Sequence, residues 1–255
     1  MIYIAFFIFT FLILLLAFYQ WQYFMIFRPT YIKDRSLCQN CSLLGVKTDD
    51  GIELEGAVYE PANPKSTLLL FVGRSHDAVA LINRLSQVYP KSRIVIFNYR
   101  SYGKSGGVAT EKNILQDGLK IAQLVQKNYG DFYLLGFSLG SSVAAYVASK
   151  QKVSALFLIG AFDSIEQLLR NKHAKISYLP KLLRYKFKTM QYMQNVTAYT
   201  YLFVSHDDEL IPLKNARNLK KHIKNLVYYE EFDGLSHKEL LWDPRVINKI
   251  NEVII

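Results

Sequence analysis

A serine flanked by glycines stands where a predicted strand meets a predicted helix. The sequence Gly136-Phe137-Ser138-Leu139-Gly140 follows the apolar run 132–135, and small or apolar residues then recur at helical spacing as far as residue 148. Glycine on both sides lets neighbouring backbone pass close to a tight turn, which presents the hydroxyl at the strand's carboxyl end, beside a helix N-terminus. The pattern predicts that Ser138 is a nucleophile; the alternative is an ordinary serine in a strand-to-helix connection.

Partners for such a serine are expected on loops that follow later strands, because the carboxyl ends of parallel strands meet at one edge of a sheet. Asp207 and Asp208 follow a predicted strand at 201–204, and His237 follows another at 226–230. Serine, then aspartate, then histidine is the chain order in which this kind of turn carries a catalytic triad. We therefore predict that His237 acts as the base and that one of the two aspartates orients it.

The segment that contains these residues alternates between strands and helices. Apolar runs typical of strands buried on both faces lie at 67–72, 94–97, 132–135, 153–159 and 200–204. Helical periodicity lies between or after them at 78–88, 113–128, 139–148 and 244–253, and alternating runs around Asp50-Gly51 predict a hairpin over 46–59. The predicted fold class is α/β, with a mostly parallel sheet flanked by helices.

Three regions follow from this pattern. Residues 1–27 are predicted to be a transmembrane anchor, 28–44 a juxtamembrane linker and 45–255 the α/β domain. Within the domain, residues 162–195 interrupt the alternation with weakly periodic helices. We expect them to form a small lid over the carboxyl edge of the sheet.

The first 27 residues are long and apolar enough to cross a bilayer. As a helix they would measure about 40 Å, against roughly 30 Å of hydrocarbon. A cleaved signal peptide would begin with basic residues and end at a small-residue site, which Phe18-Tyr19-Gln20-Trp21 does not offer, so we expect a retained signal-anchor. Because Arg28, Lys33 and Arg35 follow the span, the positive-inside rule favours the cytoplasmic side for the domain.

The cysteines and the net charge limit the classes of partner. Cys38 and Cys41 either close a disulfide on an oxidising face or stay as thiols in the cytosol, and no other cysteine supplies the further ligands that zinc needs. The 31 Lys and Arg exceed the 21 Asp and Glu by ten, but no basic helix or aromatic-plus-arginine motif accompanies them, so we expect attraction to anionic lipid rather than to nucleic acid. The basic residues of the predicted lid lie either against the membrane or on a solvated face; they are Arg170, Lys172, Lys175, Lys181, Arg184, Lys186 and Lys188.

Three further blocks resemble those of a known superfamily. Residues 49–54, Asp-Asp-Gly-Ile-Glu-Leu, resemble the opening hairpin of α/β-hydrolases. Residues 98–107, Asn-Tyr-Arg-Ser-Tyr-Gly-Lys-Ser-Gly-Gly, resemble their Asp-Tyr-Arg-Gly-Tyr-Gly-x-Ser-x-Gly loop, and residues 208–212, Asp-Glu-Leu-Ile-Pro, resemble their acid loop. From about residue 27 onward the chain resembles, most of all, the single-span membrane-anchored serine hydrolases with a minimal lid.

The resemblance implies a role for each matching residue. Ser138 would be the nucleophile, His237 the general base, and Asp208 the acid that orients it, because the family's acid precedes its proline by four positions. The oxyanion hole would use the backbone N–H groups of Leu139 and Arg74. The chain departs from the family at Val72, which stands where a histidine usually precedes the glycine of the oxyanion loop, at Asn98 in place of aspartate and at Ser101 in place of glycine.

We therefore expect a carboxylesterase, lipase or thioesterase that works through an acyl-enzyme and needs no metal or cofactor. The tether and the apolar lid residues Ile176, Leu179, Leu182 and Leu183 favour acyl chains carried on lipids or on acylated proteins as substrates. We expect a monomer. The alternative is a catalytically silent α/β-hydrolase that serves as a membrane-bound binding or scaffold protein, which the altered oxyanion loop alone supports.

Overall fold

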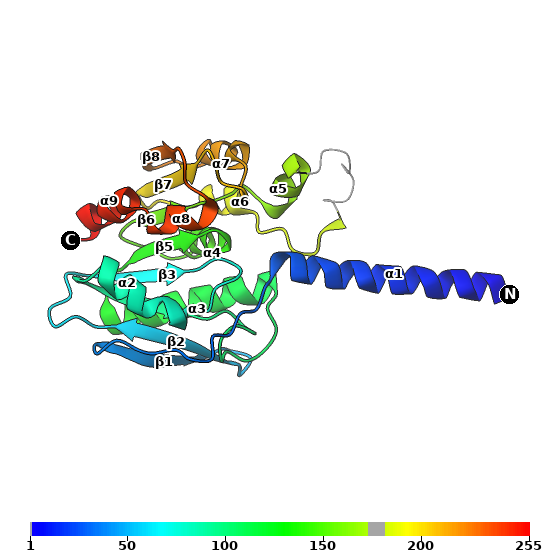
Figure 1. Cartoon of the computed structure of the whole chain (residues 1–255), viewed down its shortest axis with the longest axis horizontal. Helices are drawn as coiled ribbons and strands as arrows, with labels where there is room; N and C mark the ends of the chain where they lie inside the picture. The colour runs from blue at the N-terminus through cyan, green and yellow to red at the C-terminus, as the bar shows by residue number, and fades with distance from the viewer. Residues whose placement is uncertain (1, 173–181) are drawn as a thin grey trace.

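The computed structural model describes residues 2–172 and 182–255. In them an eight-stranded sheet is covered by helices on both faces, and one long helix projects from the domain (Figure 1). The predicted α/β class with a mostly parallel sheet is confirmed. Lys175, Ile176, Leu179 and Lys181, for which the sequence predicts a place in the lid, lie outside the described residues.

The strands follow the order β1-β2-β4-β3-β5-β6-β7-β8 across the sheet. Their bounds are β1 (Cys41–Lys47), β2 (Glu53–Tyr59), β3 (Ser66–Phe71), β4 (Ser92–Phe97), β5 (Tyr133–Phe137), β6 (Leu156–Ile159), β7 (Thr200–Ser205) and β8 (Leu226–Phe232). The predicted hairpin is confirmed as the antiparallel pair β1–β2; β2 also pairs antiparallel with β4, and the strands from β4 to β8 run parallel. The chain leaves β3 toward β4 and leaves β5 toward β6, in opposite directions, so a crevice is expected at the carboxyl ends of β3 and β5.

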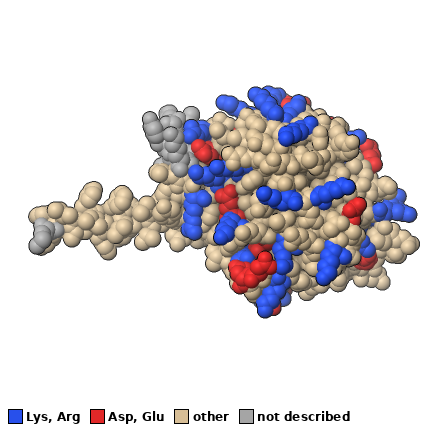
Figure 2. All heavy atoms as spheres, turned by 180° about the vertical axis from the view of Figure 1, so that it is seen from behind, with Lys and Arg blue, Asp and Glu red and all other residues tan. Residues whose placement is uncertain are grey.

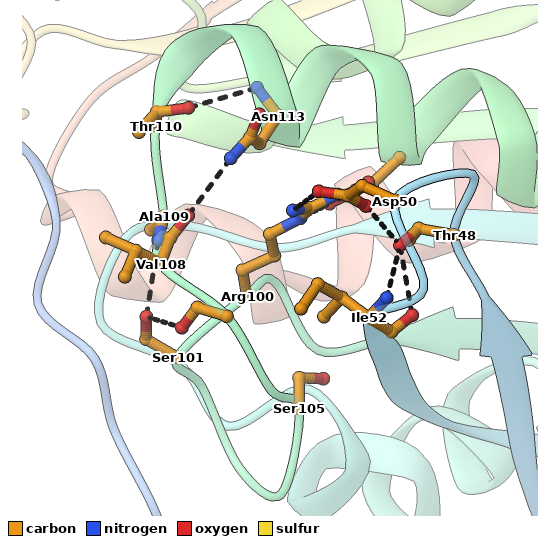
Figure 3. Close-up of polar contacts among 12 residues, drawn as sticks. Thr48, Asp50, Ile52, Arg100, Ser101, Ser105, Val108, Ala109, Thr110 and Asn113 are labelled. Atoms are coloured by element: carbon orange, nitrogen blue, oxygen red, sulfur yellow. Dashed lines mark hydrogen bonds and ion pairs between the residues drawn. The ribbon is translucent and has the colours of Figure 1, made fainter.

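Helices precede, connect and follow these strands along the chain. Their bounds are α1 (Ile2–Ile26), α2 (Ile82–Val88), α3 (Glu111–Tyr129), α4 (Leu139–Ala148), α5 (Ile165–Lys172), α6 (Thr189–Met193), α7 (Leu213–Lys220), α8 (His237–Trp242) and α9 (Pro244–Ile254). The predicted helix over 78–88 opens as a 3₁₀ turn, Val79–Leu81, and β6 begins three residues later than the apolar run that predicted it. α3 starts where the Thr110 side chain accepts a hydrogen bond from the Asn113 N–H (Figure 3). It is followed by Gly130, whose φ of +78° favours glycine.

The two family-like blocks at 49–54 and 98–107 meet around one arginine. Arg100 donates to both oxygens of Asp50 at 2.6 and 2.8 Å and to both oxygens of Asp117 at 2.7 and 2.8 Å, and Thr48 also donates to Asp50 (Figure 3). The hydrogen bond from Arg100 holds the pKa of Asp50 well below its ordinary value. Arg100 therefore ties the hairpin turn to α3 and fixes the loop that follows β4.

The linker between α1 and the sheet is held by a buried polar cluster. Arg35 donates to both carboxylate oxygens of Glu55, at 2.7 and 2.9 Å, and to Asp77 at 3.2 Å. Burial opposes ionisation of Glu55, but the hydrogen bonds from Arg35 and from the Lys104 N–H outweigh it and keep the pKa of Glu55 below its ordinary value. The Asn98 amide donates to Glu55 and to Asp77 at 3.0 Å each, which an aspartate at this position would not do. The departure from the family at Asn98 thus fits the two carboxylates beside it.

α1 has two parts with different surroundings. Most side chains from Ile2 to Trp21 are exposed, whereas Gln22 and Ile26 are buried against the domain. By length and composition the helix can cross a membrane. Just beyond it, Cys38 and Cys41 are joined as a disulfide.

Candidate active site

The turn after β5 has the geometry that a displayed nucleophile requires. Ser138 has φ +54° and ψ −119°, and its N–H donates to the Ile159 carbonyl at 2.9 Å. The flanking glycines allow close packing: a Cβ on Gly136 would lie 2.5 Å from the Gly140 carbonyl oxygen, and a Cβ on Gly140 would lie 2.0 Å from that of Phe71. The turn is strained and crowded, so only glycine fits at both flanks.

His237 is positioned by a helix start and by a carboxylate. It is the first residue of α8, where Ser236 and Glu239 form a capping box. Its Nδ1 lies 2.7 Å from the Asp208 Oδ2, and both groups are buried. The other oxygen of Asp208 accepts from the N–H groups of Leu210 and Ile211, at 2.9 and 2.7 Å. An Nδ1–H that donates to Asp208 leaves Nε2 as the basic nitrogen of the neutral ring.

The two neighbouring aspartates of this loop have different contacts. Asp208 faces His237, whereas the Asp207 Oδ2 accepts from the Gly234 N–H at 2.6 Å. Asp207 thereby ties the loop after β7 to the loop that leads into α8. The geometry gives Asp208 the orienting contact and Asp207 a structural one.

Phe137 and Gly160 connect the surroundings of Ser138 with those of His237, and no hydrogen bond joins the Ser138 hydroxyl to the His237 ring among the described residues. The ring of Phe137, next to the serine, stacks on the His237 imidazole with centroids 4.9 Å apart. Gly160 follows the residue that accepts from the Ser138 N–H, and a Cβ on Gly160 would lie 3.0 Å from the His237 Cε1. The His237 Nε2 is buried and has no hydrogen-bond partner among residues 2–172 and 182–255. A buried basic nitrogen without a partner is suited to accept the proton of a hydroxyl.

A largely apolar cavity of about 210 Å³ opens beside the serine. Ser138, Leu139 and Arg74 are among the residues that line it. Apolar side chains from three other parts of the chain form most of the remaining wall, to which Lys172 of α5 also contributes; the apolar ones are Met25 and Ile26 of α1, Phe162, Ile165, Leu168 and Leu169 in and before α5, and Leu210 and Ile211 after β7. Such a lining is suited to a hydrocarbon chain rather than to a polar group.

The two predicted oxyanion donors lie at this cavity. Leu139 begins α4, and Arg74 lies in the loop after β3. Neither backbone N–H donates to another group within the part of the chain that the structure describes. Two free N–H groups beside a nucleophile are the elements of an oxyanion hole.

The loop after β3, which carries the predicted oxyanion donor Arg74, is fixed by contacts that the sequence did not predict. The Tyr99 hydroxyl donates to the Val72 carbonyl at 2.7 Å, and the Tyr102 hydroxyl donates to the Arg74 carbonyl at 2.6 Å. Burial raises the pKa of both phenols, which keeps them protonated as donors. The two tyrosines belong to the block 98–107, which resembles a family motif, and this resemblance could have indicated that they have a structural role. They hold both sides of the loop although Val72 replaces the usual histidine.

His76 is a second histidine close to the serine. The ideal Cβ position of Gly73 lies 3.2 Å from the His76 Nδ1 and 3.3 Å from the Ser138 Cβ. The His76 ring packs edge-on against Phe137, and burial lowers the pKa of its imidazole. His76 is therefore a neutral wall of the oxyanion loop at pH 7, with no contact to the Asp208 carboxylate.

Known proteins resemble the chain at low sequence identity. No protein-family model matches the sequence. An uncharacterized protein of Acanthamoeba polyphaga mimivirus is 25% identical over 209 residues, which cover 73% of this chain and 71% of that protein. The lysophosphatidylserine lipase ABHD12 of Danio rerio is 20% identical over 190 residues, which cover 63% of this chain and 50% of the lipase.

Solved structures match over most of the domain. An esterase of Pyrococcus furiosus superposes with a TM-score of 0.67 at 15% identity and covers 90% of this chain and 96% of its own. An alpha-beta hydrolase of Vibrio vulnificus superposes with a TM-score of 0.69 at 17% identity and covers 84% of this chain and 81% of its own. The chain has the α/β-hydrolase fold.

Substitution of Gly160 tests whether the position of the His237 ring matters for activity. Gly160 follows β6, at the carboxyl edge of the sheet where α/β-hydrolases carry their nucleophile and histidine. Gly160 has φ +55°, and a Cβ there would press on the His237 ring at 3.0 Å. We expect Gly160→Ala to lower kcat about 100-fold, because small misplacements of a catalytic group have effects of this order. Gly130→Ala is the matched control, since Gly130 also has a positive φ, +78°, but nothing within 4 Å of its Cβ position.

The measurement is kcat on p-nitrophenyl butyrate, with the unfolding temperature of each variant recorded beside it. Both substitutions place an alanine at a positive φ, so Gly130→Ala is also expected to lose stability, but it should keep its kcat. Equal losses of kcat in the two variants would contradict a specific effect on His237.

Proposed function

We propose that the protein is a serine hydrolase that cleaves carboxylic ester or thioester bonds through an acyl-enzyme. The observation that carries the proposal is the buried His237, whose Nδ1 contacts Asp208 while its Nε2 lacks a partner among the described residues, next to a serine in a strained turn. The α/β-hydrolase fold supports this choice, since esterases are among the proteins that share it. The lipase and the esterase named above support a hydrolase more broadly.

The mechanism follows from the named groups. The Ser138 oxygen attacks the carbonyl carbon while the His237 Nε2 takes its proton, and the N–H groups of Leu139 and Arg74 stabilise the oxyanion. The bond to the leaving alcohol or thiol then breaks, and His237 returns the proton to that group. A water molecule next gives a proton to His237 and attacks the carbonyl carbon of the acyl-enzyme. The bond from that carbon to the Ser138 oxygen then breaks as His237 returns the proton to this oxygen, which releases the carboxylic acid and restores the serine.

Acyl chains on lipids or on proteins are the proposed substrates. The apolar cavity supports a hydrocarbon chain, and α1 supports work at a membrane. Figure 2 shows Lys and Arg on the domain surface up to the base of α1, which itself has none. Attraction to anionic headgroups would hold such a surface near the bilayer. Two cations of the predicted lid are already engaged, because Arg170 pairs with Glu166 at 3.0 Å and Lys172 donates to the Glu209 carbonyl.

Two features favour opposite sides of the membrane for the α/β domain. The cations after α1 favour the cytoplasmic side, whereas the Cys38–Cys41 disulfide is typical of an oxidising compartment. Alkylation of intact cells with a membrane-impermeant maleimide, with and without prior reduction, distinguishes the two. We propose the cytoplasmic side, for which no alkylation is expected until the cells are permeabilised.

Covalent labelling tests the proposed function directly. A fluorophosphonate probe should modify the detergent-solubilised protein on Ser138, located by the mass of the modified peptide, because an activated serine attacks phosphorus as it attacks a carbonyl. His237→Ala is the control and should lose the label, since the serine then has no base. A folded wild-type protein that takes no label would contradict the proposal and favour the silent scaffold.

A further inference from the structure

The end of the long helix α1 is part of the cavity beside the serine. Met25 and Ile26, its last two residues, line the same cavity as Ser138, and Ile26 is only 3% exposed. A segment that served only as a tether would not need to contact the site. The last turn of α1 therefore contacts any molecule that fills the cavity.

Contacts on the domain hold this turn in a fixed position. The buried Gln22 accepts a hydrogen bond from the Arg184 N–H at 2.8 Å through its side-chain oxygen. Phe27, directly after the helix, is fully buried and packs against the rings of Tyr185 and Phe187, with centroids 4.9 and 6.1 Å apart. Because polar and aromatic contacts flank Met25 and Ile26 in sequence, the two side chains cannot move away from the cavity independently of the domain.

The same turn is joined to the oxyanion loop. The Arg74 guanidinium donates to the Met25 carbonyl, at the helix C-terminus, where a cation is favoured. The Arg28 N–H donates to the Arg74 carbonyl at 3.1 Å and to the Tyr102 hydroxyl at 2.9 Å. The helix end and the proposed oxyanion donor Arg74 therefore form one hydrogen-bonded unit.

The length of the exposed part of α1 places the cavity close to a bilayer. Residues 2–21 rise about 30 Å at 1.5 Å per residue, which equals the thickness of the hydrocarbon layer. If these residues span it, Met25 and Ile26 lie within about one and a half turns of the membrane surface, some 6–8 Å away. This position places Met25 and Ile26 between the bilayer and the serine along α1.

We propose that the last turn of α1 forms a wall of the acyl-chain subsite and sets the chain length that the enzyme accepts. The inference rests on the proposed function, because it assigns the cavity to the acyl group of the substrate. It makes the anchor a specificity element of the site, with Met25 and Ile26 as the residues that contact the chain.

Met25→Trp tests the inference, with Phe24→Trp as the matched control. Phe24 lies in the same helical turn but is 62% exposed and does not line the cavity. The measurement is kcat/KM for p-nitrophenyl esters from C4 to C16 on the full-length protein in detergent. Each buried methylene is worth about a factor of four, so a tryptophan that displaces two of them should lower the C16 to C4 ratio about 15-fold. Phe24→Trp should leave the ratio within about twofold of wild type.

A second variant and a comparison of two acyl carriers extend the test. Met25→Ala enlarges the cavity and should move the preferred chain to a longer one, and it provides the test if Met25→Trp does not fold. The shift is expected whether the chain is carried on a lysophospholipid or on an S-acyl peptide, and the carrier that is turned over faster identifies the source.

Labelling of Ser138 by a short-chain fluorophosphonate distinguishes failure of this inference from failure of the proposed function. Wild type and the Phe24→Trp control should both take the label. If wild type is labelled and the Met25 variants have its chain-length profile, the inference is overturned. If wild type is not labelled, the proposed function itself is wrong.

Discussion

Ser138→Ala is expected to lower kcat by at least about 10⁴-fold with almost no change in stability. Loss of the nucleophile removes the acyl-enzyme route, and only binding and the oxyanion donors would remain. The side-chain hydrogen bond at Ser138 is the one that its backbone carbonyl accepts from the Ser141 hydroxyl, which the substitution leaves in place, so loss of the Ser138 hydroxyl should shift the unfolding temperature by no more than about 2 °C. Steady-state hydrolysis of p-nitrophenyl butyrate and a thermal melt measure the two effects.

Ser142→Ala is the matched control for that experiment. Ser142 lies one turn further along α4, is buried, and has no hydrogen-bond partner for its hydroxyl among the described residues, but it does not line the cavity. The control should keep full kcat. His237→Ala should match the loss in Ser138→Ala, and the double variant should lose little more, because the two residues act as a unit. An active Ser138→Ala protein would refute the assignment.

The strands and the nucleophile turn were predictable because their signals are local. The run 132–135, the glycines at 136 and 140 and the following apolar periodicity lie within about 16 residues, and each feature has one dominant structural cause. The choice between Asp207 and Asp208 was different. The two share a loop and a charge, and the direction of each side chain depends on backbone turns that alternation of apolar residues does not encode. The resemblance to a family, rather than the residue pattern, pointed to Asp208.

The place of the last turn of α1 was not predictable from the sequence. Met25 and Ile26 look like the residues before them, because an apolar side chain suits lipid and an enzyme cavity equally well. The partner of Gln22 is Arg184, which is 162 positions away, and the partner of the Met25 carbonyl is Arg74. Such contacts between distant segments arise from tertiary packing. The buried Gln22 in an apolar helix was the one available signal, because a polar group in such a position needs a hydrogen-bond partner.

Gly140→Ala is expected to damage both stability and activity, because the added methyl group has no space. Its Cβ would lie 2.0 Å from the Phe71 carbonyl oxygen and 2.7 Å from the Val72 carbonyl oxygen, both of which are backbone atoms of the segment that leads into the oxyanion loop. α4 and the end of β3 must separate to admit it. Overpacking against backbone should cost about 3 kcal/mol, which lowers the unfolding temperature by roughly 6–12 °C for a chain of this size.

The effect of Gly140→Ala on activity should exceed what its loss of stability explains. The shift of β3 moves the Arg74 N–H relative to Leu139, and loss of one oxyanion donor typically lowers kcat 10²–10³-fold. Gly45→Ala in β1 is the control, since its Cβ position has nothing within 4 Å and its φ is not positive. It should stay within about 0.5 kcal/mol of wild type and keep its kcat. If folded Gly140→Ala protein, assayed well below its unfolding temperature, hydrolysed p-nitrophenyl butyrate at the wild-type rate, the loop after β3 would have no part in stabilising the oxyanion.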